Sequence, residues 1–171
     1  PDNAIQHARI ARSELFNNDR DAFMEKLSRE ISAFIRKAEK KNLVPVVRLN
    51  GTSDILWETI PYQKHASIME AFPTIQFYDY TKVYKRAIRT LPTNYHLSLS
   101  YSQANQKYAL ATQTITRQSD VNLVVVFRDE LPDTFLGREV INGDESDLRF
   151  LDPAGVIVGL KAKGKAKKDT S

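Results

Sequence analysis

The chain has 171 residues, 42% hydrophobic and 27% charged, which suits one globular domain and is too apolar for a disordered segment. Because it contains no cysteine, disulfides, zinc–thiolate sites, thiol nucleophiles and iron–sulfur clusters on its own thiolates are excluded. No apolar run approaches the roughly 20 residues that span a bilayer, and the polar N-terminus does not resemble a signal peptide. We therefore expect a cytoplasmic protein that makes no membrane contact.

The first forty residues have the apolar periodicity of two consecutive helices. Residues 3–16 are compatible with a first helix, and Asp19 is placed to cap a second. In the second helix one apolar stripe recurs at spacings of three and four, formed by Phe23, Leu27, Ile31, Phe34 and Ala38.

From residue 43 onward, short β-branched or aromatic runs alternate with helical patterns. The sequence predicts strands over 43–49, 74–80, 94–100, 121–127, 139–142 and 156–160, and helices over 63–72, 82–90 and 103–116. Helices that separate strands imply βαβ units and a mainly parallel sheet.

Three consecutive predicted strands have one apolar and one polar face. In strand 94–100, Leu97 and Leu99 alternate with His96, Ser98 and Ser100. Parallel sheets covered by helices on both faces normally read as continuous apolar runs, so we expect the polar face to line a wet or ligand-filled lumen. The expected fold is an α/β partial (βα) barrel with helices outside, formed by residues 1–160, and residues 161–171 make a Lys-rich tail.

The densest polar cluster follows the first strand, from Arg48 to Asp54. Arg48 is suited to paired hydrogen bonds with a carboxylate or phosphate, and Asn50 and Asp54 to a ribose, an amine or a metal-bound water. The alternative is an Asn-Gly turn in which Asp54 caps the chain.

Further polar side chains end the next two strands. Asp79 and Lys82 suit either acid–base chemistry or the capping of the following helix. His96 suits a general base or ligand, with Ser98 and Ser100 on its face, although strand histidines are more often hydrogen-bonded core residues. The three histidines are too dispersed for a metal site, and no Gly-rich phosphate-binding motif is present.

The net charge of +4 comes from the end of the chain. Residues 1–160 carry 20 basic and 20 acidic side chains, and the tail contains Lys161, Lys163, Lys165, Lys167 and Lys168 with one acid, Asp169. These lysines suit weak contacts with nucleic acid phosphates, or the tail is simply solvated.

Several long blocks resemble the gene product 88 family of phage and plasmid proteins. They are VRLNGTSDILWE (47–58), FPTIQFYDYTK (72–82), NYHLSLSYSQAN (94–105), VVVFRDELP (124–132) and VINGDESDLRFLDPAGVIVGLKAKGKAKKD (140–169). Family members usually carry an upstream Cys-rich block, so this chain resembles a C-terminal portion or a shortened form. The resemblance implies a bacterial host cell and leaves the activity unassigned.

The family's Cys-rich block and (βα) series are similar to radical-SAM-type partial barrels, which use an iron–sulfur cluster and S-adenosylmethionine. That likeness implies catalytic roles for Arg48, Asn50, Asp54 and His96, and cofactor contacts for Asp79, Lys82, Ser98 and Ser100. Without cysteine, this chain alone is not expected to perform that chemistry. The alternatives are a nucleic-acid-binding protein and a host-directed phage interaction protein.

Overall fold

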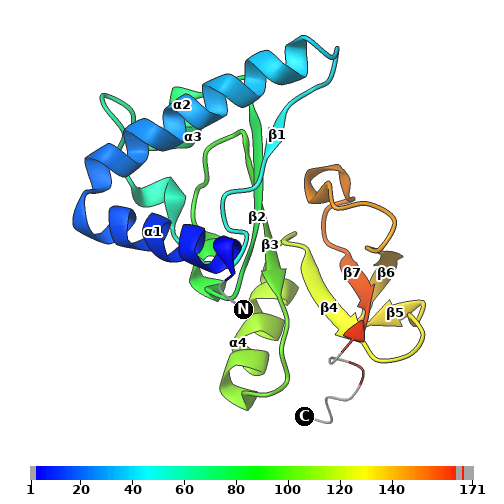
Figure 1. Cartoon of the computed structure of the whole chain (residues 1–171). Coiled ribbons are helices and arrows are strands. Elements are labelled where there is room, and N and C mark those ends of the chain that lie inside the picture. The colour runs from blue at the N-terminus through cyan, green and yellow to red at the C-terminus, as the bar shows by residue number, and fades with distance from the viewer. Residues whose placement is uncertain (1–2, 165–166, 168–171) are drawn as a thin grey trace.

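The computed structural model describes residues 3–164 and 167 and consists of helices packed beside one twisted sheet (Figure 1). The helices are α1 (Ala4–Asn18), α2 (Arg20–Glu39), α3 (Ile68–Ala71) and α4 (Gln106–Gln118), with 3₁₀ turns η1 (Trp57–Thr59), η2 (Tyr84–Ile88) and η3 (Arg149–Leu151). The strands are β1 (Val46–Val47), β2 (Gln76–Thr81), β3 (Tyr95–Ser100), β4 (Leu123–Phe127), β5 (Thr134–Phe135), β6 (Arg138–Asn142) and β7 (Ile157–Lys161).

The two N-terminal helices form a hairpin, as predicted. The Asp19 carboxylate accepts a hydrogen bond from the Ala22 N–H and caps α2, which confirms the predicted start of that helix. Ile31 and Ala38 of the predicted stripe are buried, whereas Phe34 is 43% exposed. No side chain of α1 is fully buried, so this helix rests on α2 and the neighbouring loop rather than inside a core.

The seven strands form one open sheet in the order β1-β2-β3-β4-β7-β6-β5. All neighbouring pairs are parallel except β5 and β6. The predicted mainly parallel α/β architecture is therefore confirmed. The sheet does not close, because β1 and β5 lie at its two ends, and the barrel character remains a prediction.

Cross-strand register assigns the side chains to two faces. Phe77 of β2 and Leu97 of β3 lie on the face that packs against Met24 and Ile31 of α2. The opposite face, here called the polar face, carries Tyr78, Tyr80, His96, Ser98 and Ser100. Its polar character is confined to β2 and β3, because on β4 and β7 the same face carries Val124 and Val158, which cluster with Val156.

Three predicted elements are markedly shorter in the structure, and two of them have a local cause. Strand 43–49 shrinks to β1 because Pro45 offers no N–H to a neighbouring strand, and Val44 beside it is 88% exposed. Helix 63–72 begins only at Ile68, where the Ser67 hydroxyl accepts a hydrogen bond from the Glu70 N–H and the Glu70 carboxylate accepts one from the Ala66 N–H. Segment 82–90 forms only the 3₁₀ turn η2.

The sequence prediction missed the β5–β6 hairpin. Its two-residue turn places Leu136 at φ 53° and Gly137 at φ 78°, and such left-handed turns suit the twist of a hairpin. Leucine is rare in this conformation, so the sequence carries only half of the usual turn signal.

The last strand continues beyond residue 160. β7 ends at Lys161, and Ala162 is buried with its N–H bonded to the Phe127 carbonyl. The Lys163 ammonium pairs with Asp144 at 2.8 Å. Lys167 borders a hollow that Lys161 also lines. Lys165 and Lys168 lie outside the described residues.

Candidate functional site

Asn50 holds the loop after β1 in place. Its side-chain oxygen accepts hydrogen bonds from the Ser53 hydroxyl, the Ile55 N–H and the Trp57 indole N–H, the last at 2.9 Å. Its backbone N–H donates to Asp79 at 2.8 Å, and its amide nitrogen donates to the Ile55 carbonyl at 2.9 Å. Both side-chain polar atoms of this buried residue are thus engaged within the protein, and Asn50 fixes the Trp57 ring.

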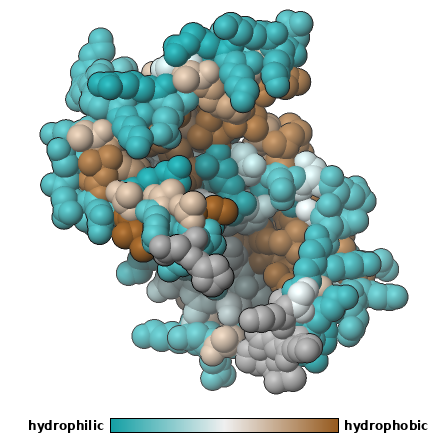
Figure 2. Space-filling model, in the orientation of Figure 1, coloured by the Kyte–Doolittle hydropathy of each residue, from teal (hydrophilic) through white to brown (hydrophobic). Residues whose placement is uncertain are grey.

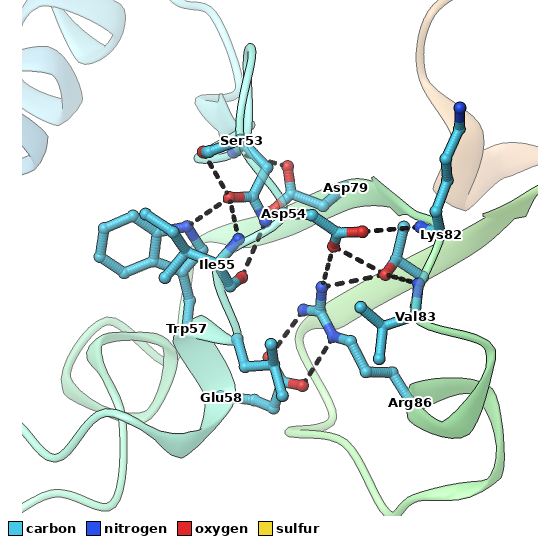
Figure 3. A network of polar contacts seen from close by, with 12 residues as sticks. Ser53, Asp54, Ile55, Trp57, Glu58, Asp79, Lys82, Val83 and Arg86 are labelled. Carbon is cyan, nitrogen blue, oxygen red and sulfur yellow. Dashed lines mark hydrogen bonds and ion pairs between the residues drawn. The ribbon is translucent and has the colours of Figure 1, made fainter. Parts of the chain in front are cut away.

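A buried arginine, Arg86, ties the same loop to η2. Its guanidinium binds both oxygens of Glu58, at 2.8 and 2.7 Å, and one oxygen of Asp54 at 2.8 Å (Figure 3). It also donates to the Tyr95 hydroxyl at 2.9 Å. Two carboxylates compensate this fully buried charge, as a buried arginine requires.

Asp54, from the loop after β1, and Asp79, from within β2, join this network. Asp54 accepts hydrogen bonds from the Thr81 hydroxyl and the Lys82 N–H, both at 2.7 Å. Asp79 is buried and accepts from the Tyr95 hydroxyl at 3.0 Å. Burial raises the pKa of Asp79 to about 6. Lys82 contributes only its backbone N–H to these contacts, and its side chain is exposed.

The other predicted residues lie across the sheet. On the polar face, the His96 ring and the Ser98 hydroxyl are 3.3 Å apart, and Ser98 is fully buried. Burial, and then the charge of Arg149, lowers the pKa of His96, which is therefore neutral at pH 7. The Ser100 carbonyl accepts a hydrogen bond from the Tyr108 hydroxyl.

The eight residues predicted to surround one cofactor therefore divide into separate groups. Asn50 and Asp79 belong to the network on the helix-covered side, and His96 and Ser98 lie on the polar face. Because the sheet itself lies between the groups, one small ligand cannot contact both.

Arg149 was not singled out from the sequence. It is 1% exposed, its Nε lies 3.4 Å from Asp152, and its Nη2 donates to the Ser146 carbonyl. Within the described chain its Nη1 has no hydrogen-bond partner, but Gly143 encloses it, since a Cβ there would lie 2.8 Å from that nitrogen. Through its contacts with Ser146 and Asp152, this buried arginine fastens segment 143–152.

Two hollows lie beside β1. Two adjoining hollows of about 490 and 590 Å³ share Arg12, Phe23, Leu49 and Trp57 in their walls. We call them together the α1–β1 groove. α1, α2, β1 and the loop after β1 line it, and Figure 2 shows hydrophobic surface beneath α2 in this region.

Positively charged side chains border the groove, and few carboxylates lie near them. The cations are Arg9, Arg12, Lys26 and Arg48, and the one carboxylate in the walls is Glu30. All four cations are exposed, and among residues 3–164 and 167 none of them forms an ion pair. A negatively charged ligand would therefore meet unpaired positive charge.

Two arginine–aromatic stacks flank the groove. The Arg20 guanidinium lies 4.0 Å from the centre of the Phe16 ring, which lines one hollow. Arg48 borders the other hollow at the edge strand β1, but its guanidinium lies 4.4 Å from the Tyr80 ring and therefore on the polar face of the sheet. Arg48, predicted as an anion-binding residue, is exposed at the edge strand, with its charge on the polar-face side of that strand.

Arg9, Arg12 and Lys26 could not be recognised as groove residues from the sequence. They lie on two helices rich in charge, and periodicity identifies the apolar stripe without telling which exposed cations face a neighbouring strand. Only the packing of the α1–α2 hairpin against β1 brings them together.

The fold and groove define an α/β protein with an open, mostly parallel sheet and a cation-lined groove at one edge. Over residues 2–171 the chain matches the family model of gene product 88. It belongs to that family of phage gene products of unassigned function, which confirms the family predicted from the sequence blocks. No curated protein and no solved structure matches the chain.

The described part of the chain contains neither a membrane-spanning helix nor a cluster of metal-binding side chains. Its helices do not combine the length and apolar character needed to cross a membrane. Residues 3–164 and 167 also contain no group of three or more His, Asp or Glu side chains arranged to hold a metal ion.

Proposed function

We propose that this protein binds an anionic ligand with an apolar part in the α1–β1 groove. The observation that carries the proposal is the set of exposed, unpaired cations above an apolar floor. Exposed surface cations usually face solvent alone, whereas here Arg12 and Lys26 border the same concavity as Phe23 and Leu27. A ligand that carries both negative charge and apolar surface gains binding free energy from the cations and from the apolar floor.

The groove is supported by a rigid wall. Trp57 is 3% exposed, its indole N–H is bound by Asn50, and its ring stacks on Phe23 at 6.0 Å. The polar network around Asn50 thus serves to hold one side of the groove in shape. A preformed wall lowers the ordering cost of binding.

Anilinonaphthalene sulfonate, an aromatic anion, tests this proposal. We expect its fluorescence to rise on binding to the native protein, and the Arg12→Glu/Lys26→Glu variant to bind it about tenfold more weakly, because two attractive charges become repulsive. The matched control is Lys107→Glu/Arg117→Glu, which reverses two exposed cations on α4 away from the groove.

The control variant should bind the dye like the wild type. Equal affinity of all three proteins, with unchanged circular dichroism, would show that the groove is not the site. A dye signal that grows in proportion to loss of near-UV circular dichroism would report unfolding and would also contradict the proposal.

A second candidate is the core of a radical-SAM-type partial barrel. It is favoured by the neighbouring parallel strands β1, β2, β3 and β4, which follow one another in chain order. The residues present do not fit an iron–sulfur cluster, since the chain has no cysteine. The test is anaerobic expression of a family member that includes a Cys-rich segment, and a colourless, iron-free protein would remove this candidate.

A further inference from the structure

We propose that the ligand of the α1–β1 groove is single-stranded nucleic acid. This inference rests on the proposed function and names its ligand class. It is argued from the spacing of the cations, the arginine–aromatic stacks and the hydroxyl groups of the groove.

The groove cations are spread out instead of converging on one point. Arg9 and Arg12 lie one helical turn apart on α1, Lys26 projects from α2, and Arg48 lies at β1. A small anion is usually held by a few converging polar groups in one pocket. Separate cations along two adjoining hollows fit a chain that carries one negative charge per repeating unit.

The flanking arginine stacks offer planar surfaces. Arg20 lies over Phe16 and donates its Nε–H to the Phe16 carbonyl at 3.3 Å, so its plane is held in place. Arg48 is exposed and lies over Tyr80 on the polar face, so a ligand chain would reach it by passing from the groove over the edge strand β1. Unpaired bases stack on aromatic rings and on guanidinium planes, and such stacking tolerates any base.

Hydroxyl groups complete the lining. Ser13 of α1 and Thr52 of the loop after β1 are exposed in the wall of the groove, whereas the Ser53 hydroxyl already donates to Asn50. Serine and threonine hydroxyls commonly donate to phosphate oxygens. Gly51 leaves open space at the same place, because no heavy atom lies within 4 Å of the position of a Cβ there.

These features favour a single strand over a duplex and over an acidic peptide. A duplex keeps its bases stacked internally and would use only the cations. An acidic peptide would also use the cations, but it has no planar bases to stack on Arg20 and Arg48. The arginine planes therefore distinguish the three ligands.

The experiment is fluorescence anisotropy with the full chain and labelled oligonucleotides of about 15 nucleotides. The probes are oligo(dT), oligo(U), a duplex of equal length and poly-glutamate as competitor. We expect the single strands to bind more tightly than the duplex, with affinity that falls as salt rises from about 50 to 200 mM. The two single strands distinguish DNA from RNA as the source.

The first variant removes three groove cations, as Arg9→Ala/Arg12→Ala/Lys26→Ala. Each phosphate contact on a single strand contributes about 0.7 to the slope of log affinity against log salt, so the slope should shrink by about 2. The control Lys85→Ala/Lys107→Ala/Arg117→Ala removes three exposed cations that do not line the groove and should leave the slope unchanged.

The second variant, Arg20→Lys/Arg48→Lys, keeps both charges and removes both planes. We expect it to bind oligo(dT) at least about fivefold more weakly, with the salt slope of the wild type. Binding of poly-glutamate should be unchanged, because it depends on charge alone.

The outcomes separate this inference from the proposed function. If the dye anion binds in the groove and oligonucleotides do not, the inference is wrong and the proposed function stands. If poly-glutamate displaces the dye better than oligo(dT), the partner is an acidic protein and the inference is wrong. If the dye does not bind in the groove either, both fail. Wild-type oligonucleotide affinity in the lysine variant would also overturn the inference.

Discussion

At the scale of single residues, the most constrained part of the molecule is the network around Asn50, Asp79 and Arg86. These three side chains are buried, and each makes several hydrogen bonds within the protein. Burying such groups is costly unless they are paired, and here the pairing fixes the loop that forms a wall of the groove. The network is therefore best understood as a scaffold for the neighbouring surface.

Asp79 makes the stability of the fold depend on pH. Burial raises the pKa of Asp79 from 3.8 to about 6, so the folded protein holds this proton more tightly than the unfolded chain. The contribution of the protonated Asp79 carboxyl to the free energy of unfolding is fully present below about pH 4. It is lost as the pH rises through about 6, and it amounts to roughly 3 kcal/mol. We expect the unfolding free energy from urea titration to fall with rising pH, more in the wild type than in Asp79→Asn.

The comparison with Asp79→Asn removes the contributions of other groups. The lowered pKa of His96 acts in the opposite sense, because its stability is lost as the pH falls below about 6.5. His96 is present in both proteins, so its effect cancels in the difference. A difference in unfolding free energy that does not change between about pH 4 and 7 would contradict the role of Asp79.

Sequence reasoning found part of this network and missed its centre. Asn50, Asp54 and Asp79 stand out because polar side chains at strand ends are unusual, and all three make network contacts. Alternation along β2 also places Asp79 on the face of Phe77. Arg86 gave no signal, because its burial depends on the meeting of η2 with Glu58, a contact between distant segments.

At the scale of elements, the sequence predicts best where local chemistry decides. Asp19 caps α2 where predicted, and the runs 94–100 and 121–127 form β3 and β4. The predictions fail where local and tertiary preferences compete, as in the short β1 and in the hairpin turn at Leu136. Sequence periodicity cannot predict the groove, because the groove forms where separate elements pack against one another.

Truncation can test how much the residues after Leu160 contribute to the stability of the fold. A chain that ends at Leu160 loses the bond of the Ala162 N–H to Phe127 and the ion pair of Lys163 with Asp144, whereas a chain that ends at Gly164 keeps both. We expect the shorter chain to melt roughly 5 °C lower, mainly through the lost burial of Ala162 and its hydrogen bond. Differential scanning calorimetry measures the shift, and equal melting temperatures would show that β7 needs nothing beyond Leu160.

At the scale of the whole molecule, the net charge does not show where the charged side chains gather. Residues 1–160 are neutral in total, yet four cations gather at the α1–β1 groove with Glu30 alone among the carboxylates of its walls. A neutral total therefore does not argue against an anionic partner. What matters is the local excess along one edge of the sheet.

The lysines at the end of the chain predict a second, weaker contribution to nucleic acid binding. Truncation after Gly164 removes Lys165, Lys167 and Lys168, and we expect it to lower the salt slope by up to about 2. Because these lysines carry charge without planar stacking surfaces, the preference for single strand over duplex should persist. Anisotropy with both probes measures it, and loss of that preference on truncation would assign recognition to the tail instead of the groove.

The open sheet also explains how this protein can avoid self-association. Both of its terminal strands, β1 and β5, are only two residues long, and Pro45 precedes β1 without an N–H to offer. Exposed strand edges are templates for pairing with other copies, and short edges interrupted by proline are poor templates. β1 is shorter than the predicted strand 43–49, and this short edge disfavours edge-to-edge aggregation.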